Sequence, residues 1–407
     1  MPSPSLAGSR PTVLMLLTNA YEPDPRVRQE ALALIRNGCR VRILAWDRDR
    51  RFPPSECLEQ VDVDRVFLDS THGRGALQIF FYAVLYCKLF WRAFRTPFDV
   101  IHCHDLDTLP AGFFLGKLRR RPIVYDSHES FTCMLTGSVP APVRSALTML
   151  ENFLIRRVDL LITVGDKLRR HFAGRGARRT VVVGNWKRLS EFVEAPGASR
   201  ELRRTLGIPP EAFVVVCITQ LLPDRKLEEF LDAVDAVPGV YAIAGGSGKL
   251  EPMVRARALR NDRIKYAGFV KAKDIPVHTC ASDAVYYGFD PSNPNARFSA
   301  PNKLFEALAA GLPIVTGDFG EIGELVRTAG CGIVLNEYSL AEVSRALITL
   351  SNRDARQAMG EKARRLGESS FNWERAEKVL CSEYASLVGT LPGPATALTR
   401  TEASADV

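Results

Sequence analysis

The chain has 407 residues, of which 46% are hydrophobic and 25% are charged. This length is too great for one ordinary hydrophobic core, so two domains are expected, and the composition is that of a globular protein. The nine cysteines are scattered, which excludes CxxC pairs and metal-ligand spacing and indicates reduced thiols in a cytoplasmic protein. The N-terminal MPSPSLAGSRPT lacks a charged start followed by a long apolar core, so no secretory signal is expected.

The formal net charge of +8 lies in the first half of the chain. Lys and Arg outnumber Asp and Glu by 29 to 20 over residues 1–195, whereas the counts are 25 and 26 over the remainder. A basic half suggests an anionic partner, either nucleic acid or an anionic membrane. No zinc-finger or RNP-type pattern accompanies this charge, so no nucleic-acid partner is expected.

The first half alternates apolar runs with segments of helical spacing. The run TVLMLLT at 12–18 is expected to be a buried strand, and RVRQEALALIRNG at 26–38 a helix that stops at Gly38. Strands that are apolar throughout and separated by helices predict a parallel sheet covered on both faces. Further strands are expected at 40–46, 100–105, 160–165 and 180–185, a strand and loop at 122–129, and helices at 108–118 and 143–158.

A stretch rich in Pro, Gly and charge at 190–210 marks a domain junction, and the same alternation restarts after it. We therefore predict an α/β fold with two Rossmann-like domains, residues 1–190 and 191–370. A last helix over 371–388 is expected to pack back towards the first domain, and the tail 389–407 to be disordered. The second half is expected to hold strands at 213–219, 240–245, 264–269, 283–288, 313–317 and 331–336, and helices at 226–234 and 340–351.

The segment ALQIFFYAVLYCKLFWRAFR at 76–95 has an uncharged block followed by three cations. It is too short and too charged at one end to predict a membrane span. One interpretation is an ordinary core helix of the first domain. The other is a helix in the membrane interface, with its aromatic side chains in the lipid and its cations at the level of the phosphates.

Ligands of open parallel sheets bind beyond the carboxyl ends of the strands, where the polar side chains of this chain gather. The stretch SAPNKLFEALAAGLPIVTG at 299–317 predicts a helix that Ser299 caps and whose first-turn N–H groups suit a phosphate. Asn302 and Glu306 share a helix face; Lys303 offers a cation to a phosphoryl oxygen, and Glu306 offers two acceptors to vicinal ribose hydroxyls. The alternative is a Lys–Glu pair on a solvated face.

Two further groups follow strands of the second half. Arg225 and Lys226 stand where a strand ends and a helix opens, which suits a diphosphate, although they also fit a solvated helix start. Gly245, Gly246 and Gly248 follow the strand VYAIAG and let backbone amides approach a nucleotide closely. A lone glycine cluster is weak support, and a purely structural turn stays open.

The first half supplies a histidine and carboxylate set that suits hydrogen bonds to sugar hydroxyls or proton shuttling. No serine elbow and no metal triad is visible in the sequence. A structural role for His128, or a supporting role for His104 behind it, stays open. The candidate residues are Asn19 and Arg26 in NAYEPDPRVRQE, His104 and Asp105 after VIHCHD, and His128 and Glu129 in YDSHE.

Seven motifs together resemble the retaining nucleotide-sugar glycosyltransferases of family 4. The resemblance covers roughly residues 12–388 and implies the GT-B fold, two Rossmann-like domains facing each other across a cleft. It also implies that the first domain binds the acceptor and the second the nucleotide sugar. The motifs are DPRVRQEA, HCHDLDTLPAG, IVYDSHE, LLPDRKLEEFLDA, AIAGGSGKLE, SAPNKLFEALAAGLPIVT and FNWERAEKVL.

The resemblance assigns roles in the second domain. Glu306 looks like the second Glu of the family's Glu-seven-residues-Glu motif, which holds the ribose. Arg225 looks like the diphosphate cation, with Lys226 beside it where a glycine is usual. Asn302 and Lys303 match the PNK variant of the helix start.

In the first domain, His128 looks like the family's histidine near the transferred sugar, and the family requires no catalytic metal. Two positions depart from the pattern. Phe298 stands where the first Glu of the motif falls, so donor-sugar recognition is expected from Ser299, Asn302 or backbone amides. The usual glycine-rich loop after the first strand is replaced by NAYEPDPRV, in which Arg26 is expected to take part of its role.

The resemblance implies a hexosyltransferase that uses a nucleotide-diphosphate sugar, retains the anomeric configuration and needs no cofactor. The expected acceptor is a lipid-linked saccharide in exopolysaccharide or surface-glycan synthesis. Membrane contact through residues 76–95 would place the protein on the inner face of the cytoplasmic membrane. Two other functions stay open: a nucleotide-sugar 2-epimerase, which needs no acceptor, and a non-catalytic partner in a polysaccharide assembly complex, suggested by Phe298.

Overall fold

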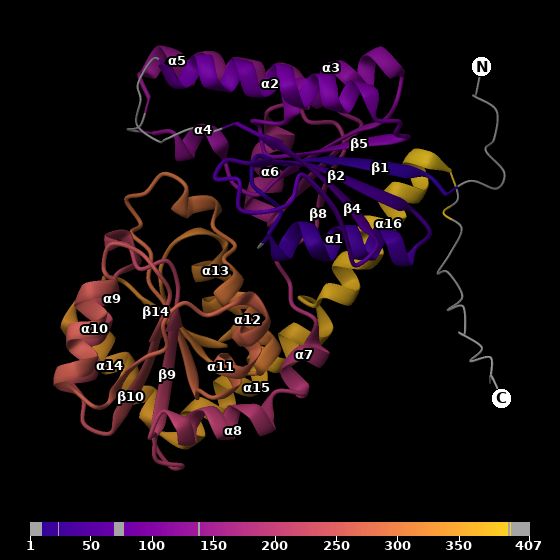
Figure 1. The fold of residues 1–407 in the computed structure, drawn as a ribbon. Coiled ribbons are helices and arrows are strands. Elements are labelled where there is room, and N and C mark those ends of the chain that lie inside the picture. Colours follow the sequence, from indigo (N-terminus) through magenta and orange to yellow (C-terminus); the bar gives the residue numbers. More distant parts are fainter. Residues whose placement is uncertain (1–9, 23, 69–76, 137–138, 390, 392–407) are drawn as a thin grey trace, which may run out of the picture. The chain divides into compact units, whose positions relative to one another are not determined.

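The computed structural model describes the chain apart from residues 1–9, 23, 69–76, 137–138, 390 and 392–407 (Figure 1). It contains an eight-stranded sheet of order β3-β4-β2-β1-β5-β6-β7-β8 and a six-stranded sheet of order β11-β10-β9-β12-β13-β14. The predicted α/β class with two Rossmann-like sheets is confirmed. The tail predicted to be disordered lies outside the described residues, except for two of its positions.

In the first sheet, β4, β2, β1, β5 and β6 pair in parallel, and the edge strand β3 is antiparallel to β4. Its strands β5, β6 and β7 are buried over their whole length, and β1 is buried apart from Thr12, as expected for strands with helices on both faces. In the register, Leu14 pairs with Arg42 on one side and Ile101 on the other. The strands are β1 (Thr12–Leu16), β2 (Arg40–Asp47), β3 (Ser55–Leu58), β4 (Val61–Phe67), β5 (Val100–His104), β6 (Ile123–Ser127), β7 (Leu160–Thr163) and β8 (Thr180–Val182).

The hairpin β3–β4 is absent from the sequence-based prediction. Its strands are antiparallel, with Leu58 opposite Val61, and the two residues between them are Glu59 and Gln60. Both have positive φ, 49° and 71°, as a two-residue hairpin turn requires. Asn-Gly or Asp-Gly is usual at such a turn, so Glu-Gln carries no turn signal in the sequence.

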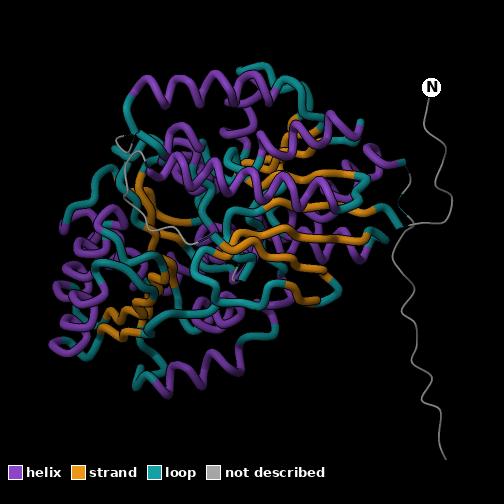
Figure 2. Tube along the Cα trace, turned by 45° about the horizontal axis from the view of Figure 1, so that its top comes forward, coloured by secondary structure: helices purple, strands orange, loops and turns teal. Residues whose placement is uncertain are grey.

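The second sheet is parallel throughout. Figure 1 shows α9, α10 and α14 on one face of it and α11, α12 and α13 on the other, and Figure 2 shows its strands between these helices. Its strands are β9 (Phe213–Ile218), β10 (Val240–Gly245), β11 (Ile264–Tyr266), β12 (Ala284–Tyr287), β13 (Ile314–Gly317) and β14 (Gly332–Leu335). Its helices are η1 (Pro223–Arg225), α9 (Leu227–Ala236), α10 (Glu251–Arg260), η2 (Ala272–Asp274), α11 (Ile275–Cys280), η3 (Ala296–Phe298), α12 (Asn302–Ala310), α13 (Gly320–Ala329), α14 (Leu340–Ser351) and α15 (Arg353–Ser369).

The residues divide into two compact units, Met1–Asp126 with Leu154–Leu161 and Leu380–Val407, and Ser127–Phe153 with Ile162–Val379. The domain bounds expected from the sequence stay a prediction. The remaining helices are α1 (Pro25–Arg36), α2 (Leu77–Arg95), α3 (Leu109–Arg119), α4 (Phe131–Met134), α5 (Ala141–Ile155), α6 (Asp166–Gly174), α7 (Leu189–Val193), α8 (Pro196–Thr205) and α16 (Trp373–Val388).

Helix α2 packs one side into a core, as the first interpretation of the segment 76–95 expects, and the membrane-interface interpretation stays a prediction. Leu85, Leu89 and Ala93 recur every four residues and are buried, so one side of the helix belongs to a core. On the other side, Trp91 is 54% exposed and Phe94 is 38% exposed. Among the described residues, no helix combines the length and apolarity that a membrane crossing requires.

Candidate active site

The carboxyl edge of the second sheet carries the polar residues predicted to bind the donor. The strands β9, β10, β12 and β13 run parallel, so the loops that follow them leave the sheet at one edge. Two side-chain groups lie there, one at the start of α12 and one at η1.

The helix α12 begins at Asn302, with Pro301 as its N-cap residue. No side chain caps it, so the expectation that Ser299 caps this helix is wrong. An uncapped first turn keeps its N–H groups available to an anion. Glu306, one turn in, is 4% exposed and forms an ion pair with Lys303.

A residue that sequence reasoning missed completes this group. Lys187 follows β8, and its Nζ donates a hydrogen bond of 2.6 Å to Asn302 Oδ1. The same Nζ lies 3.8 Å from Glu306 Oε1, and the side chain is 16% exposed. Burial lowers the pKa of this ammonium, and the charge of Lys303 adds to that effect, while the Glu306 carboxylate opposes it.

The position of Lys187 is fixed by its backbone. Residue 187 forms a parallel bridge with Asn372, and the Trp373 N–H donates to Lys187 O at 3.0 Å. Trp373 is 1% exposed, so this attachment is anchored in the core. The sequence did contain a signal for Lys187, because it follows the strand predicted at 180–185. Polar residues just after predicted strands are the ones that were selected as candidates in the histidine loops.

Arg225 closes η1, and its guanidinium lies 4.5 Å from the centroid of the Phe289 ring. The buried Tyr287 lies near both Arg225 and Ser299, the residue that precedes α12 by three positions. Burial raises the pKa of the Tyr287 phenol, whereas the charge of Arg225 and a hydrogen bond with Ser299 oppose that rise. Arg225 and Ser299 are therefore neighbours of one side chain.

Lys226 adopts a left-handed conformation with φ of 50°. That geometry explains why a glycine is usual at this position, since glycine adopts positive φ without a steric cost. Its backbone oxygen accepts a hydrogen bond of 2.8 Å from Tyr286 Oη. Its ammonium lies 3.7 Å from Asp290 in the loop after β12 and 3.8 Å from Glu229 on α9, so it points towards carboxylates of the protein.

The fold itself requires glycine at the positions after β10, because neighbouring backbone leaves no room for a side chain. Gly246 has φ of 133°, and a Cβ there would lie 1.8 Å from the carbonyl oxygen of Thr219 in the loop after β9. A Cβ on Gly245 would lie 3.2 Å from Gly268 O. The close approach is therefore to neighbouring loops, which favours the structural alternative for this cluster.

In the first unit, Arg26 is 9% exposed and takes part in a buried charge network. Its Nε and Nη2 donate to Asp126 at 3.0 and 2.8 Å, and Nη2 lies 3.0 Å from Glu30. Burial disfavours the charged guanidinium, but the two carboxylates outweigh that effect and raise its pKa. The structure thus places Arg26 among side chains of the protein rather than at its surface.

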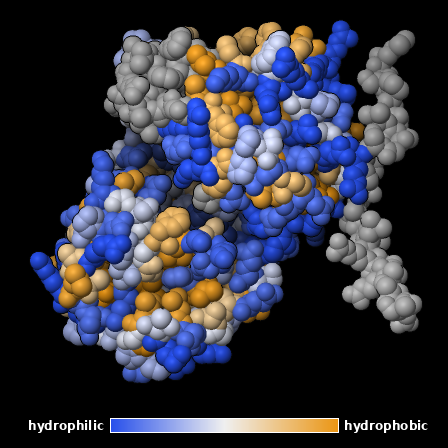
Figure 3. All heavy atoms as spheres, viewed as in Figure 1, coloured by the Kyte–Doolittle hydropathy of each residue, from blue (hydrophilic) through white to orange (hydrophobic). Residues whose placement is uncertain are grey.

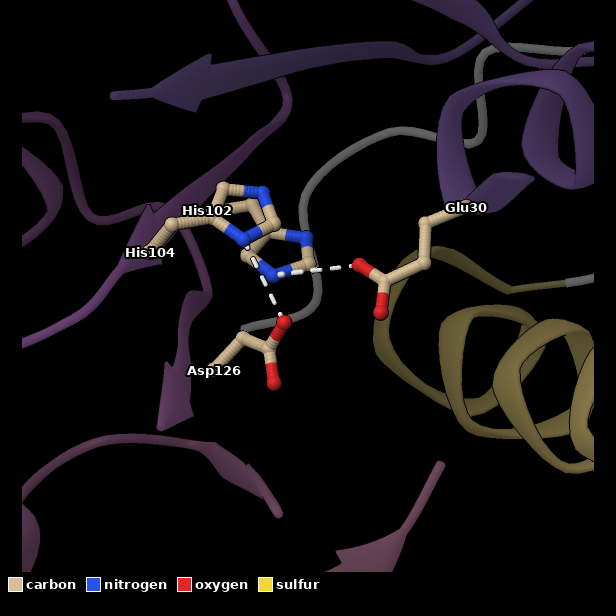
Figure 4. A group of neighbouring side chains, drawn as sticks. All are labelled: Glu30, His102, His104 and Asp126. Carbon is tan, nitrogen blue, oxygen red and sulfur yellow. Dashed lines mark ion pairs between the residues drawn. The ribbon is translucent and has the colours of Figure 1, made fainter. Parts of the chain in front are cut away.

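Figure 4 shows four neighbouring side chains of metal-ligand type, which include the two carboxylates that Arg26 contacts: Glu30, His102, His104 and Asp126. His104 Nδ1 lies 3.2 Å from Asp126, His102 Nε2 lies 3.9 Å from Glu30, and the two imidazoles stack at 4.2 Å (Figure 4). Their ligand atoms lie within 4.8 Å of one another. Because Arg26 contacts both carboxylates, a cation of the protein already offsets part of their negative charge.

Two other candidates of the first half, Asn19 and Asp105, form hydrogen bonds that stabilise the loops in which they lie. Asn19 donates to Asp24 at 2.8 Å and accepts from the Tyr21 N–H at 2.7 Å. Asp105, with φ of 61°, donates its N–H to Asp126 O at 2.9 Å and so joins the ends of β5 and β6. A positive φ at a residue other than glycine costs energy and is typical of functional loops.

His128 and Glu129 follow β6 and belong to the second unit. His128 is half-buried and Glu129 is exposed. Glu129 accepts a hydrogen bond from the Asn295 amide, and the Ser130 N–H donates to Asn295 Oδ1 at 3.3 Å. Asn295 lies between β12 and α12, and no sequence motif marked it.

Two family descriptions match consecutive parts of the chain. "Glycosyl transferase 4-like domain" matches residues 23–186, and "Glycosyl transferases group 1" matches residues 198–366. The chain belongs to the group 1 glycosyltransferases, family 4. The resemblance inferred from the motifs is confirmed, and so is the GT-B fold.

Among curated relatives, the D-inositol 3-phosphate glycosyltransferase of Mycobacterium marinum is 24% identical over 309 residues, 72% of this chain. The match covers 64% of that relative and about half the length of others. Among solved structures, sucrose-phosphate synthase of Thermosynechococcus elongatus has a TM-score of 0.76 at 16% identity and covers 93% of this chain and 99% of that one. The HepE protein of Anabaena in complex with UDP-glucose has a TM-score of 0.68 at 18% identity, with 92% and 100% covered.

Proposed function

We propose that this glycosyltransferase moves a hexosyl group from a nucleotide-diphosphate sugar to a lipid-linked saccharide, with retention of anomeric configuration. The observation that carries the proposal is the start of α12, where Glu306 lies between the ammonium groups of Lys303 and Lys187 beside an uncapped helix end. Cations beside a carboxylate suit a ligand that combines a diphosphate with ribose hydroxyls.

In this proposal, the second half binds the donor. The sugar–phosphate bond lengthens in the transition state, and negative charge grows on the diphosphate. Arg225, Lys303 and the first-turn N–H groups of α12 stabilise that charge, so the protein's own cations suffice without a metal or other cofactor. Glu306 accepts hydrogen bonds from the ribose hydroxyls, and Lys226 adds positive charge nearby.

The donor sugar is then oriented by other groups, because Phe298 offers no carboxylate. Ser299 and Asn302 are the assigned contacts, whereas the Gly246 N–H already donates to Gly268 O at 2.8 Å, in keeping with the structural role of that glycine cluster. His128 lies against the transferred sugar in this proposal.

We assign the acceptor to the first half, residues 1–190. Glu129, Asp105 and Asn19 hydrogen-bond to acceptor hydroxyls in this proposal. Arg26 and His104 support those loops through the buried charge network.

Contact with the inner face of the cytoplasmic membrane is assigned to the α2–α3 face, defined as the exposed side chains Trp91, Phe94, Phe114 and Leu118. These are 54%, 38%, 60% and 56% exposed, and Figure 3 shows apolar side chains gathered over α2 and α3. The Arg95 guanidinium lies 4.7 Å from the Trp91 ring centroid. Apolar rings beside cations are typical of surfaces that bind anionic lipid, which suits surface-glycan or exopolysaccharide synthesis.

The testing experiment has two stages. Nucleotide sugars are first screened by thermal shift, because a ligand that binds only the native state raises its stability. The donor found is then incubated with lipid-linked saccharides, and NMR identifies the product and its anomeric configuration. A retained glycosidic product supports the proposal. A new epimer without acceptor indicates an epimerase, and donor binding without turnover over a broad acceptor panel indicates a non-catalytic partner.

A further inference from the structure

A cavity of about 380 Å³ lies within the second unit, outside the groups described above. It is bounded by α4 and α5 on one side and by the segment that leads into η3 on the other. Its lining is polar and contains no carboxylate. The residues that line it are Thr132, Cys133, Thr136, Arg144, Thr148, Pro294 and Arg297.

The two arginines of this cavity have only weak partners for their charge. Arg144 Nη1 donates to Thr136 Oγ1 at 3.1 Å, and Arg297 Nη2 donates to Cys133 Sγ at 3.4 Å. Among the described residues, no carboxylate lies within 4.0 Å of either guanidinium. By contrast, Arg175 in the same unit lies 2.6 Å from Glu151.

The positive charge of this region affects a neighbouring histidine, His171. The ring of His171 lies 4.6 Å from that of Phe298 at an angle of 46°, and the Arg297 guanidinium lies 4.6 Å from the same Phe298 ring. The pKa of His171 is lowered to about 4, mainly by burial and in addition by the charges of Arg175 and Arg297. His171 is therefore neutral near pH 7 and adds no positive charge to that of Arg144 and Arg297, whereas the nearby Arg175 is paired with Glu151.

The cavity adjoins the residues assigned to the acceptor. His128 and Glu129 stand immediately before α4 in the chain, and Glu129 is hydrogen-bonded to Asn295, the residue after the lining Pro294. Hydroxyl groups of Thr132, Thr136 and Thr148 line the same space. Two forked guanidinium donors with hydroxyl donors beside them are the groups that recognise a phosphate or a carboxylate.

We propose that this cavity is a subsite for an anionic group of the acceptor, held by Arg144 and Arg297. The inference rests on the proposed function, because it assigns the chemistry of that reaction's acceptor. The shared chemistry is a phosphate or carboxylate oxygen. Its source is either the phosphate that links a saccharide to its lipid or the carboxylate of a uronic acid.

The test measures anion binding without any donor or turnover. Inorganic phosphate and glucuronate are titrated into the full chain, with glucose as the neutral comparison, and binding is followed by calorimetry. Wild type is expected to bind at least one anion and not glucose. Arg144→Gln and Arg297→Gln are each expected to weaken that binding by at least about tenfold, since each removes one charge-assisted contact. Arg260→Gln, an exposed arginine on α10, is the matched control and should bind as wild type does.

The identity of the anion that binds shows whether the subsite takes a lipid phosphate or a uronic acid. Glucuronate binding alone indicates a uronic acid, and phosphate binding alone indicates the lipid phosphate. Thermal shifts with the donor should be unchanged in both variants, which shows that they are folded and that the donor site is intact. Anion binding that is absent in wild type, or equal in wild type and both variants, overturns the subsite. Failure of every nucleotide sugar to bind would instead count against the proposed function.

Discussion

Lys187 donates a hydrogen bond of 2.6 Å from its Nζ to Asn302 Oδ1, although 115 residues separate the two positions. The contact places a second ammonium beside Glu306, in addition to that of Lys303. If Lys303 turns to a phosphoryl oxygen when the donor binds, Glu306 keeps a cationic neighbour. Lys187 is then a positioning residue that keeps the carboxylate oriented.

Replacing Lys187 by Met should weaken donor binding by about tenfold, because one charge-assisted contact to the α12 start is lost. The side chain is of similar length and buries without an unpaired charge. Donor affinity is measured by calorimetry and KM, and kcat should change less than KM. Lys273→Met, at an exposed position in η2, is the control. Unaltered affinity in Lys187→Met would show that the contact has no role in donor binding.

Replacing Glu306 by Ala should lower transfer at least about 100-fold, since hydrogen bonds from two ribose hydroxyls to a carboxylate are lost. The fold should remain, with a loss of about 1–3 kcal/mol in the free energy of unfolding because two ammonium groups lose their shared partner. Donor turnover and denaturant unfolding are the two measurements. Glu194→Ala, an exposed control, should change neither. Wild-type turnover in Glu306→Ala would remove this residue from the site.

Replacing Gly246 by Ala should destabilise the fold by more than about 3 kcal/mol, because its Cβ would meet Thr219 O at 1.8 Å and the loop after β9 must move. Gly239→Ala is the matched control: its φ of 77° is also positive, but nothing lies within 4 Å of the added Cβ. Thermal unfolding compares the two. Equal losses would mean that backbone strain, and not the close approach, sets the cost.

The double substitution of Trp91 and Phe114 by Ala should weaken binding to vesicles that contain anionic phospholipid by at least about tenfold, since burial of a large apolar side chain contributes about 1.5–3 kcal/mol. Vesicle sedimentation is the measurement, and added salt should weaken wild-type binding further. Leu259→Ala, 90% exposed in the second unit, should bind as wild type does. Equal binding by wild type and the double variant would exclude the α2–α3 face as the contact.

The sequence by itself determined the features that depend on local pattern. Apolar runs separated by helical spacing predicted both parallel sheets, because a strand buried on both faces must be apolar throughout. The pair of Lys303 and Glu306 was also visible, since residues three apart on a helix are neighbours. The hairpin at Glu59 and Gln60 was not predicted, because its turn lacks the Asn-Gly or Asp-Gly pair that favours positive φ.

Only the tertiary structure decided which distant side chains meet. Arg26 looked like a loop cation free to meet a ligand, but Asp126, 100 residues away, binds it in a buried network. Lys187 carried no motif and reaches the start of α12 because its backbone bridges Asn372. Such contacts follow from how strands and helices pack, and no spacing along the chain encodes them.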